Sequence, residues 1–311
     1  MPRLTQGAHR ARAGVSIIEV IITIMILGIV GTALTRVMMK QQQSYRDAAK
    51  QADMQRELRL TSSMLPAELR SLSSAGGDVL VMDEDKVEFL ANIGSGVVCD
   101  KVGNTHIAVP PTNAAEVTTT NWYTQPQPGD TMFMYNDSLG KGSDDDVWAR
   151  RVIANITMDF ARCPGAPYTH PTLDAGKPRW FIGVGALGIP DSVRIGAVVR
   201  FARPVRYSIY QEASGKWYVG YQELISGNWT TTEAVGGPYN RFQPGDILPT
   251  GLQFRYFDSL GTRLTSAIDR LSVSRIDVYL RSDAGVAAVT ERRPNTLKDS
   301  VMMRIAVRNF K

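Results

Sequence analysis

A single carboxylate, Glu19, lies near the start of an apolar run that extends from Val15 to Thr35. Gly14 directly precedes this run, so that Glu19 is the fifth residue after the glycine. An ionisable group within a segment of membrane length is costly, and by default its position marks a function. In surroundings without water, a carboxylate needs a cationic partner. Glu19 is therefore the first candidate for a functional residue, and its chemistry is charge pairing.

The element that must position Glu19 is a helix of membrane length. Residues 15–35 match the roughly 20 residues, rising ~1.5 Å each, that cross a hydrocarbon core of about 30 Å. The apolar core of a secretory signal is shorter, at roughly 7–15 residues. The preceding segment has no acidic side chain and contains three arginines, Arg3, Arg10 and Arg12. An ordinary signal anchor explains the length and the basic flank, but it does not explain Gly14 or Glu19.

This N-terminal pattern resembles that of the type IV prepilins. The resemblance implies that residues 1–14 are a leader, that a prepilin peptidase cuts after Gly14, and that the new N-terminus at Val15 is methylated. It also implies that Glu19, as the fifth mature residue, pairs with the terminal amine of a neighbouring subunit. The chain departs from the family at two positions. Val15 stands where phenylalanine is commonest, and Arg36 stands where a proline usually kinks the helix.

The helix is expected to continue beyond the membrane segment, over residues 36–75. Pro66 is expected to bend its last turns, and the sequence Ser-Ser-Ala-Gly-Gly at 73–77 to end it. A coiled-coil dimer is the alternative, but the heptad pattern is too irregular for it. Apolar residues at helical spacing form a rough face, which comprises Ala48, Ala52, Leu58, Met64, Leu65, Leu69 and Leu72.

Residues 76–311 are predicted to form one β-rich globular head. Runs of β-branched and aromatic residues recur there, and turn-forming sequences such as 212–215 and 258–261 separate them. Several runs alternate between polar and apolar residues, as in a sheet with one solvated and one packed face. The sequence therefore predicts an α+β, pilin-like fold in which a long N-terminal helix packs on an antiparallel β-rich head.

About the last hundred residues of this head look like the larger minor pilins of the PilW kind and the related J-type minor pseudopilins of type II secretion. The similarity rests on a hairpin-like unit and three later segments, at 205–221, 251–261, 274–281 and 304–309. The stretch 94–190 is rich in Pro, Thr, Asn and Gly and shows no resemblance that we can name. We expect a loop-rich insertion there.

Charge and cysteine content agree with an exported, membrane-tethered protein. The full chain has 35 Lys and Arg against 30 Asp and Glu, a net charge of +5. Removal of the leader leaves 32 basic residues and a charge of +2, which is weak support for nucleic-acid binding. The only cysteines are Cys99 and Cys163. In an oxidising periplasm we expect them to form a structural disulfide, and two unpaired buried thiols are the alternative.

No sequence motif indicates catalysis or a cofactor. The three histidines, His9, His106 and His170, show no metal-ligand spacing, and neither a nucleophile elbow nor a phosphate-binding glycine loop occurs. The acidic run of Asp144, Asp145 and Asp146 is a weak calcium candidate without EF-hand spacing, and a solvated turn explains it more simply. We expect a non-enzymatic protein that needs no cofactor.

These observations predict a minor type IV pilin, which primes or caps a pilus and contributes to adhesion and motility. The expected partners are other minor and major pilins, the prepilin peptidase, the inner-membrane assembly platform and a tip adhesin. Before assembly, the chain would cross the inner membrane once, with a periplasmic head. It would then join an extracellular pilus, at the tip.

Two alternatives remain open. One is a J-type minor pseudopilin of a type II secretion system. The other is a pilin-stalked receptor for DNA or another ligand, although the basic residues available to it are expected to form a solvated strand face. These residues are Arg200, Arg203, Arg206, Arg292 and Arg293.

Overall fold

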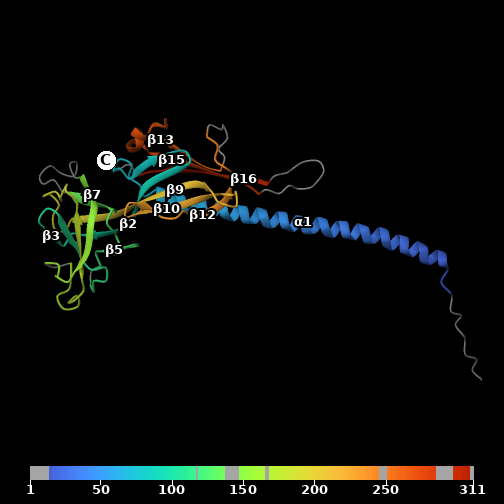
Figure 1. Cartoon of the computed structure of the whole chain (residues 1–311), viewed down its shortest axis with the longest axis horizontal. Helices are drawn as coiled ribbons and strands as arrows, with labels where there is room; N and C mark the ends of the chain where they lie inside the picture. The colour runs from blue at the N-terminus through green and yellow to red at the C-terminus, as the bar shows by residue number, and fades with distance from the viewer. Residues whose placement is uncertain are drawn as a thin grey trace, which may run out of the picture. The chain divides into compact units, whose positions relative to one another are not determined.

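A long helix followed by antiparallel strands makes up the computed structural model of the chain, as Figure 1 shows. The residues that the structure describes are 14–116, 118–136, 147–164, 168–244, 251–284 and 297–308. The chain divides into two compact units, residues 1–53 and residues 54–311. The predicted α+β fold, with an N-terminal helix and an antiparallel β-rich head, is confirmed.

Helix α1, Ile17–Leu69, exposes its apolar side chains throughout the first unit. Ile17 is 80% exposed and Ile29 is 70% exposed. The most apolar window of α1 has a mean hydropathy of 2.5, and no part of it is buried. By length and composition, α1 can cross a membrane, and it is compatible with a single-pass anchor.

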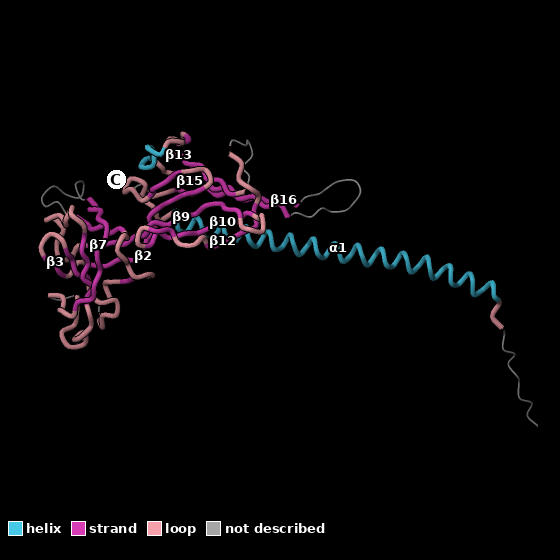
Figure 2. The backbone as a smooth tube through the Cα atoms, viewed as in Figure 1, coloured by secondary structure: helices cyan, strands magenta, loops and turns pink. Residues whose placement is uncertain are grey.

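The last turns of α1 belong to the second unit and pack on the strands, as the cyan helix beside magenta strands shows in Figure 2. Their buried stripe has helical spacing and consists of Met54, Leu58, Thr61, Leu65 and Leu69. Ala48 and Ala52 are exposed, so the expected apolar face begins later than the sequence suggested. Beyond Leu69 the N–H groups of Ser71 and Leu72 bond to the residue three positions back. The chain therefore leaves the helix just before the expected end.

The larger sheet has twelve strands, all in antiparallel pairs, and its main path is β1-β2-β9-β6-β7-β8-β4-β3. Strand β10 continues it beside β9, and β11 and β12 pair with β10, while β5 pairs with β2. The bounds are β1 Val79–Met82, β2 Lys86–Val97, β3 Asp100–Val102, β4 His106–Val109, β5 Asn121–Trp122, β6 Thr131–Asn136, β7 Val147–Asp159, β8 Arg179–Val184, β9 Val198–Gln211, β10 Trp217–Ile225, β11 Asn228–Trp229 and β12 Glu233–Tyr239.

The smaller sheet has four antiparallel strands in the order β14-β13-β15-β16. A short 3-10 helix, η2, follows β14, and its start is capped by the Ser266 side chain, which accepts a hydrogen bond from the N–H of Ile268. The bounds are β13 Leu252–Phe257, β14 Arg263–Leu264, η2 Ala267–Ser272, β15 Arg275–Ala284 and β16 Leu297–Ala306.

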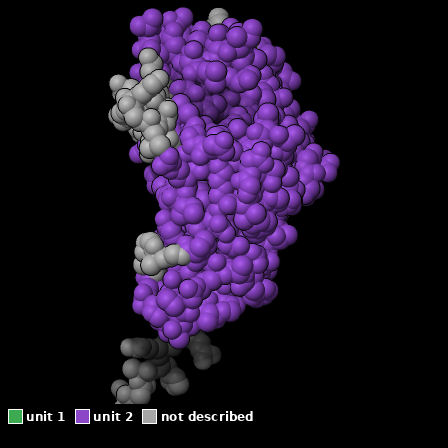
Figure 3. All heavy atoms as spheres, turned by 90° about the vertical axis from the view of Figure 1, so that its left-hand side faces the viewer, with its two compact units in different colours: residues 1–53 green, residues 54–311 purple. Residues whose placement is uncertain are grey.

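Two hydrophobic cores lie along the same long strands, β2 and β9. Phe89 and Tyr207 belong to a first core, which also contains the buried stripe of α1 and the inner face of the smaller sheet. Ile93 and Phe201 belong to a second core, which strands β4, β6, β7 and β8 complete. Successive residues of a strand point to opposite faces, and one face of β9 thus lines both cores. Figure 3 shows residues 54–311 as one continuous body.

The stretch 94–190 is more ordered than the sequence indicated. Six strands of the described residues, β3 to β8, begin within it, and β4, β6, β7 and β8 contribute residues to the second core. Strand β7 is the longest of these, and it escaped the sequence analysis because polar and charged residues such as Arg150, Arg151 and Asn155 interrupt its apolar pattern. Loops still connect these strands, so the expectation of a loop-rich insertion holds only between them.

Candidate functional site

Residues 14–16 form an open start to α1. The carbonyl oxygen of Ser16 accepts hydrogen bonds from the N–H groups of Glu19 and Val20, at 3.0 and 3.2 Å. No atom lies within 4 Å of the place that a Cβ would take at Gly14, and Val15 is 70% exposed. Glu19 lies in the first turn of the helix, where the macrodipole favours a negative charge. Gly14, Val15 and Glu19 are thus gathered on a short accessible segment.

Glu19 differs from the hydroxyl side chains of the same segment in having no side-chain partner among the described residues. Thr23 donates to the carbonyl oxygen of Glu19 at 2.6 Å, and Thr32 and Thr35 donate to carbonyl oxygens within the preceding turn. Such back-bonding satisfies a hydroxyl group without water. The Glu19 carboxylate, in contrast, makes no hydrogen bond or ion pair with any described residue. A carboxylate in an apolar segment is costly unless a cation or a hydrogen-bond donor pairs with it.

The predicted disulfide between Cys99 and Cys163 is confirmed. The two Cα atoms are 5.5 Å apart and the residues are separated by 64 positions. Both cysteines are almost fully buried, and Ala108, Tyr168 and Phe181 pack around them. The bridge ties the chain at the end of β2 to the chain just after β7, and so closes a loop that contains much of the second core.

The strand arginines proposed for a receptor are engaged in ion pairs. Arg200 bonds to Asp78 at 2.9 Å, and Arg206 bonds to Glu88 at 2.6 Å. Arg203 is only 2% exposed, and its guanidinium makes two bonds of 2.9 Å to Asp130. A solvated face was therefore the wrong expectation for Arg203. Arg292 and Arg293 lie outside the described residues.

The weak calcium candidate, Asp144, Asp145 and Asp146, also lies outside the residues that the structure describes. Within the described ranges, no cluster of three or more His, Cys, Asp or Glu side chains is arranged to hold a metal ion. His106 stacks on Phe181, with ring centroids 4.7 Å apart, and the Nε2 atom of His170 lies 3.5 Å from the Oε1 atom of Glu116.

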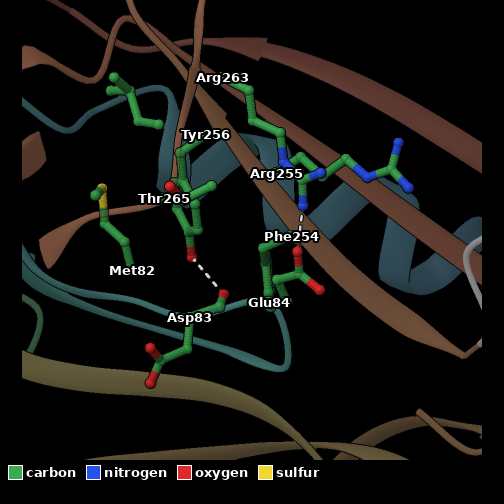
Figure 4. Close-up of a pocket in the computed structure, with 9 residues that line it drawn as sticks. Met82, Asp83, Glu84, Phe254, Arg255, Tyr256, Arg263 and Thr265 are labelled. Carbon is green, nitrogen blue, oxygen red and sulfur yellow. Dashed lines mark hydrogen bonds and ion pairs between the residues drawn. The ribbon is translucent and has the colours of Figure 1, made fainter. Parts of the chain in front are cut away.

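A small pocket of about 150 Å³ lies between the β1–β2 turn and the smaller sheet (Figure 4). Its polar side chains bind one another. The hydroxyl group of Tyr256 donates to the carbonyl oxygen of Asp83 at 3.1 Å, and Arg263 forms an ion pair with Glu84. Burial raises the pKa of Tyr256, which therefore remains a neutral donor. These contacts fasten β13 and β14 to the turn, which is a structural role.

A larger groove, of about 430 Å³, lies where α1 ends above the sheet, and we name it the α1-end groove. Glu68 from the last turn of α1 forms one wall, Phe89 of β2 and Val205 of β9 lie on the floor, and Glu223 of β10 lies beside them. Register explains this grouping, because Phe89 pairs with Val205 and Val205 pairs with Glu223 across three adjacent strands. The volume falls within the usual range of small-ligand sites, about 300–1,000 Å³.

Burial shifts the pKa of two groups in the α1-end groove, the Glu68 carboxyl and the Tyr221 hydroxyl. Desolvation raises the pKa of the Glu68 carboxyl, the charge of Glu223 adds to this effect, and a hydrogen bond from Tyr207 opposes it. Desolvation also raises the pKa of the Tyr221 hydroxyl, which donates to Glu223 at 3.0 Å. Sequence reasoning missed this site. Glu68 and Glu223, which are acidic residues within apolar stretches, are the only sequence features that could have indicated the groove. In the sequence alone, each resembles an ordinary surface residue.

No family model, curated protein or solved structure matches this chain.

Proposed function

We propose that this chain is a filament subunit of the minor pilin type, which acts by assembly and not by catalysis. The observation that carries the proposal is the arrangement at the start of α1. There an accessible glycine stands five residues before Glu19, whose carboxylate has no partner among the described residues, and no part of the most apolar window of the following helix is buried. That surface needs a cover of lipid or of other helices.

In this proposal, α1 first holds the subunit in the inner membrane. Cleavage after Gly14 frees the amine of Val15, which then carries a positive charge. When the subunit passes into a filament, Glu19 of one copy pairs with the terminal amine of a neighbour, because a buried carboxylate is tolerated only with such a partner. The pairing would set the axial register between adjacent helices.

The head would then lie in the periplasm, in contact with other minor and major subunits. The Cys99–Cys163 bridge supports an oxidising compartment, since disulfides are rare in reducing ones. The further partners in this proposal are the prepilin peptidase, the assembly platform and a tip adhesin.

Processing at Gly14 gives the first test. The intact mass of protein extracted from membranes should correspond to a chain that begins at Val15 with one added methyl group. Gly14→Val should leave the leader attached, although the space around Gly14 is open and the change disturbs no contact within the chain. A mature N-terminus at any other residue contradicts the proposal.

Pairing by Glu19 gives the second test. Glu19→Ala should leave the amount in the membrane fraction within about twofold, because removal of a charge favours insertion. Its recovery in sheared filaments should fall by at least about tenfold, because the neighbour's amine loses its partner. Asp53→Ala, on the same helix but outside the apolar segment, is the matched control and should assemble normally. If both variants assemble as the wild type does, Glu19 has no pairing role.

A further inference from the structure

The outer face of the smaller sheet carries a concentration of arginine side chains. Strands β13, β15 and β16 turn their other face toward the first core, through alternate residues such as Ile276. Because successive residues of a strand point to opposite faces, the residues between them lie on the outer side. Register places Arg255, Asp277 and Arg304 in one row across the three strands, and Arg275 lies in the next row. We name the surface formed by the three arginines the arginine face.

The arginine face has a positive balance of charge. Its single carboxylate is that of Asp277, whose Oδ1 atom lies 3.1 Å from Nε of Arg275 and whose Oδ2 atom lies 4.0 Å from Nε of Arg304. The Asp277 side chain is only 3% exposed beneath these guanidinium groups. At the margin of the face, Glu84 already forms an ion pair with Arg263. Three arginines against one aspartate therefore leave two positive charges that no described carboxylate balances.

Aromatic rings hold two of these guanidinium groups against the sheet. The guanidinium carbon of Arg275 lies 4.1 Å from the ring centroid of Phe257, and that of Arg255 lies 4.8 Å from the ring centroid of Tyr279. Stacking of this kind is favourable, and it leaves the edge of the planar guanidinium free to donate hydrogen bonds. Of the Nη atoms of the three arginines, only Nη2 of Arg255 has an acceptor among the described residues, the Gln253 side chain at 3.3 Å.

The spacing of the charges indicates the kind of anion. Neighbouring strands lie about 4.8 Å apart and alternate residues of one strand lie about 6.8 Å apart, so the three arginines arise from an area about 10 Å across. One strand of duplex DNA presents a phosphate at about every 3.4 Å of the helix axis, which places three phosphates within about 10 Å. Guanidinium groups bind phosphate oxygens through pairs of parallel hydrogen bonds. A phosphodiester backbone therefore supplies the density of negative charge that complements the arginine face.

We propose that the arginine face binds the phosphate backbone of duplex DNA without reading its sequence. Arg275 and Arg304 contact neighbouring phosphates, and Arg255 extends the contact across the sheet. The rings of Phe257 and Tyr279 are occupied by guanidinium groups, so they do not stack on bases as the rings of single-strand binding proteins do. The site depends on a local excess of charge, which the net charge of the whole chain does not reveal. This inference does not depend on the proposed filament role.

Fluorescence anisotropy of a fluorescein-labelled duplex of about 20 base pairs, titrated with the full chain in micelles of an uncharged detergent, tests the proposal. Three phosphate contacts predict a slope of about −2.7 for the logarithm of the binding constant against that of the salt concentration, which is a loss of about 40-fold in affinity between about 50 and 200 mM NaCl. Two duplexes of unrelated sequence should bind within about threefold of each other, and a larger difference would contradict backbone binding. Poly-L-glutamate should compete at least about tenfold more weakly than unlabelled duplex at equal charge, because its carboxylates are less densely spaced.

Two variants locate the binding. Arg275→Gln and Arg304→Gln should each weaken binding severalfold at about 50 mM NaCl and reduce the magnitude of the salt slope by about 1. The Arg304 side chain is 69% exposed, so Arg304→Gln keeps the fold, and an unchanged tryptophan fluorescence spectrum checks this. Arg194→Gln removes an exposed arginine from the loop before β9 and should bind the duplex as the wild type does. The proposal is overturned if the duplex does not bind at about 50 mM NaCl, if poly-L-glutamate competes equally well, or if Arg304→Gln weakens binding no more than Arg194→Gln.

Discussion

Loss of the disulfide between Cys99 and Cys163 should strongly destabilise the head. The double variant Cys99→Ala/Cys163→Ala removes the bridge and leaves two small apolar side chains in its place. The bridge lies between the end of β2 and the end of β7, against Tyr168 and Phe181. Both alanines remain in apolar surroundings, so the variant introduces no unsatisfied polar group.

The magnitude follows from the length of chain that the bridge closes. For a separation of 64 residues, the loop-closure relation gives about 4 kcal/mol at 25 °C, because the reduced unfolded chain gains conformational freedom. Loss of contacts around the buried sulfur atoms acts in the same direction. Since a domain is stable by only about 5–15 kcal/mol, such a change shifts the unfolding transition far toward lower denaturant concentration.

Urea unfolding of the full chain in uncharged detergent, followed by tryptophan fluorescence, measures this change. The rings of Trp122 and Trp180 pack against the second core, with their centroids 4.9 Å apart, and their fluorescence reports on its packing. Wild-type protein treated with a phosphine reductant should unfold at the same urea concentration as the double variant, and the double variant should not respond to the reductant. A loss of less than about 1 kcal/mol would refute the loop-closure reasoning.

Two other predictions concern α1. Leu58→Ala should cost about 2–5 kcal/mol because Leu58 is 1% exposed in the first core, whereas Leu60→Ala, at a position 50% exposed, should cost under about 1 kcal/mol in the same urea assay. Glu68→Gln should raise the urea midpoint at pH 7–8. Burial raises the pKa of Glu68 above its ordinary value of 4.5, so the folded state binds the proton more tightly than the unfolded state. The stability that proton binding by Glu68 contributes is complete below pH 4.5 and is lost as the pH rises through the raised pKa of the folded state. The gain from Glu68→Gln should therefore vanish in acid, and a gain independent of pH would contradict the assignment.

The features that the sequence predicted correctly are those set by local pattern or by composition. The membrane-length helix follows from an apolar run between Val15 and Thr35, and the buried stripe from Leu58 to Leu69 follows from helical spacing. The disulfide prediction needed only the presence of two cysteines and the expectation that the head is exported. Each of these inferences depends on neighbouring residues or on chemical type, and distant parts of the chain do not change them.

The features that the sequence concealed depend on distant pairing. Arg203 looks like a solvated strand residue until Asp130, 73 positions earlier, is found beside it. That pairing makes the burial of the guanidinium tolerable, and no local sequence pattern predicts the pairing. Strand β7 likewise contains Arg150 and Arg151, which alternation rules treat as surface residues, yet Ala149 and Ile153 beside them belong to the second core.

The α1-end groove was beyond local prediction for a different reason. Its existence depends on the position where α1 ends relative to the rows of the sheet, and a helix longer by one turn would cover it with a side chain. Glu68 becomes distinctive only there, because the same glutamate on an exposed turn would be an ordinary solvated residue. The chain thus carries two carboxylates, Glu19 and Glu68, for which the described residues do not provide a full set of partners. An unpaired carboxylate is costly in apolar or shielded surroundings, and the proposed pairing of Glu19 in a filament would remove that cost for one of them. The pairing of Glu19 and the effect of Glu68 on stability can be tested separately, because the two residues lie at opposite ends of α1.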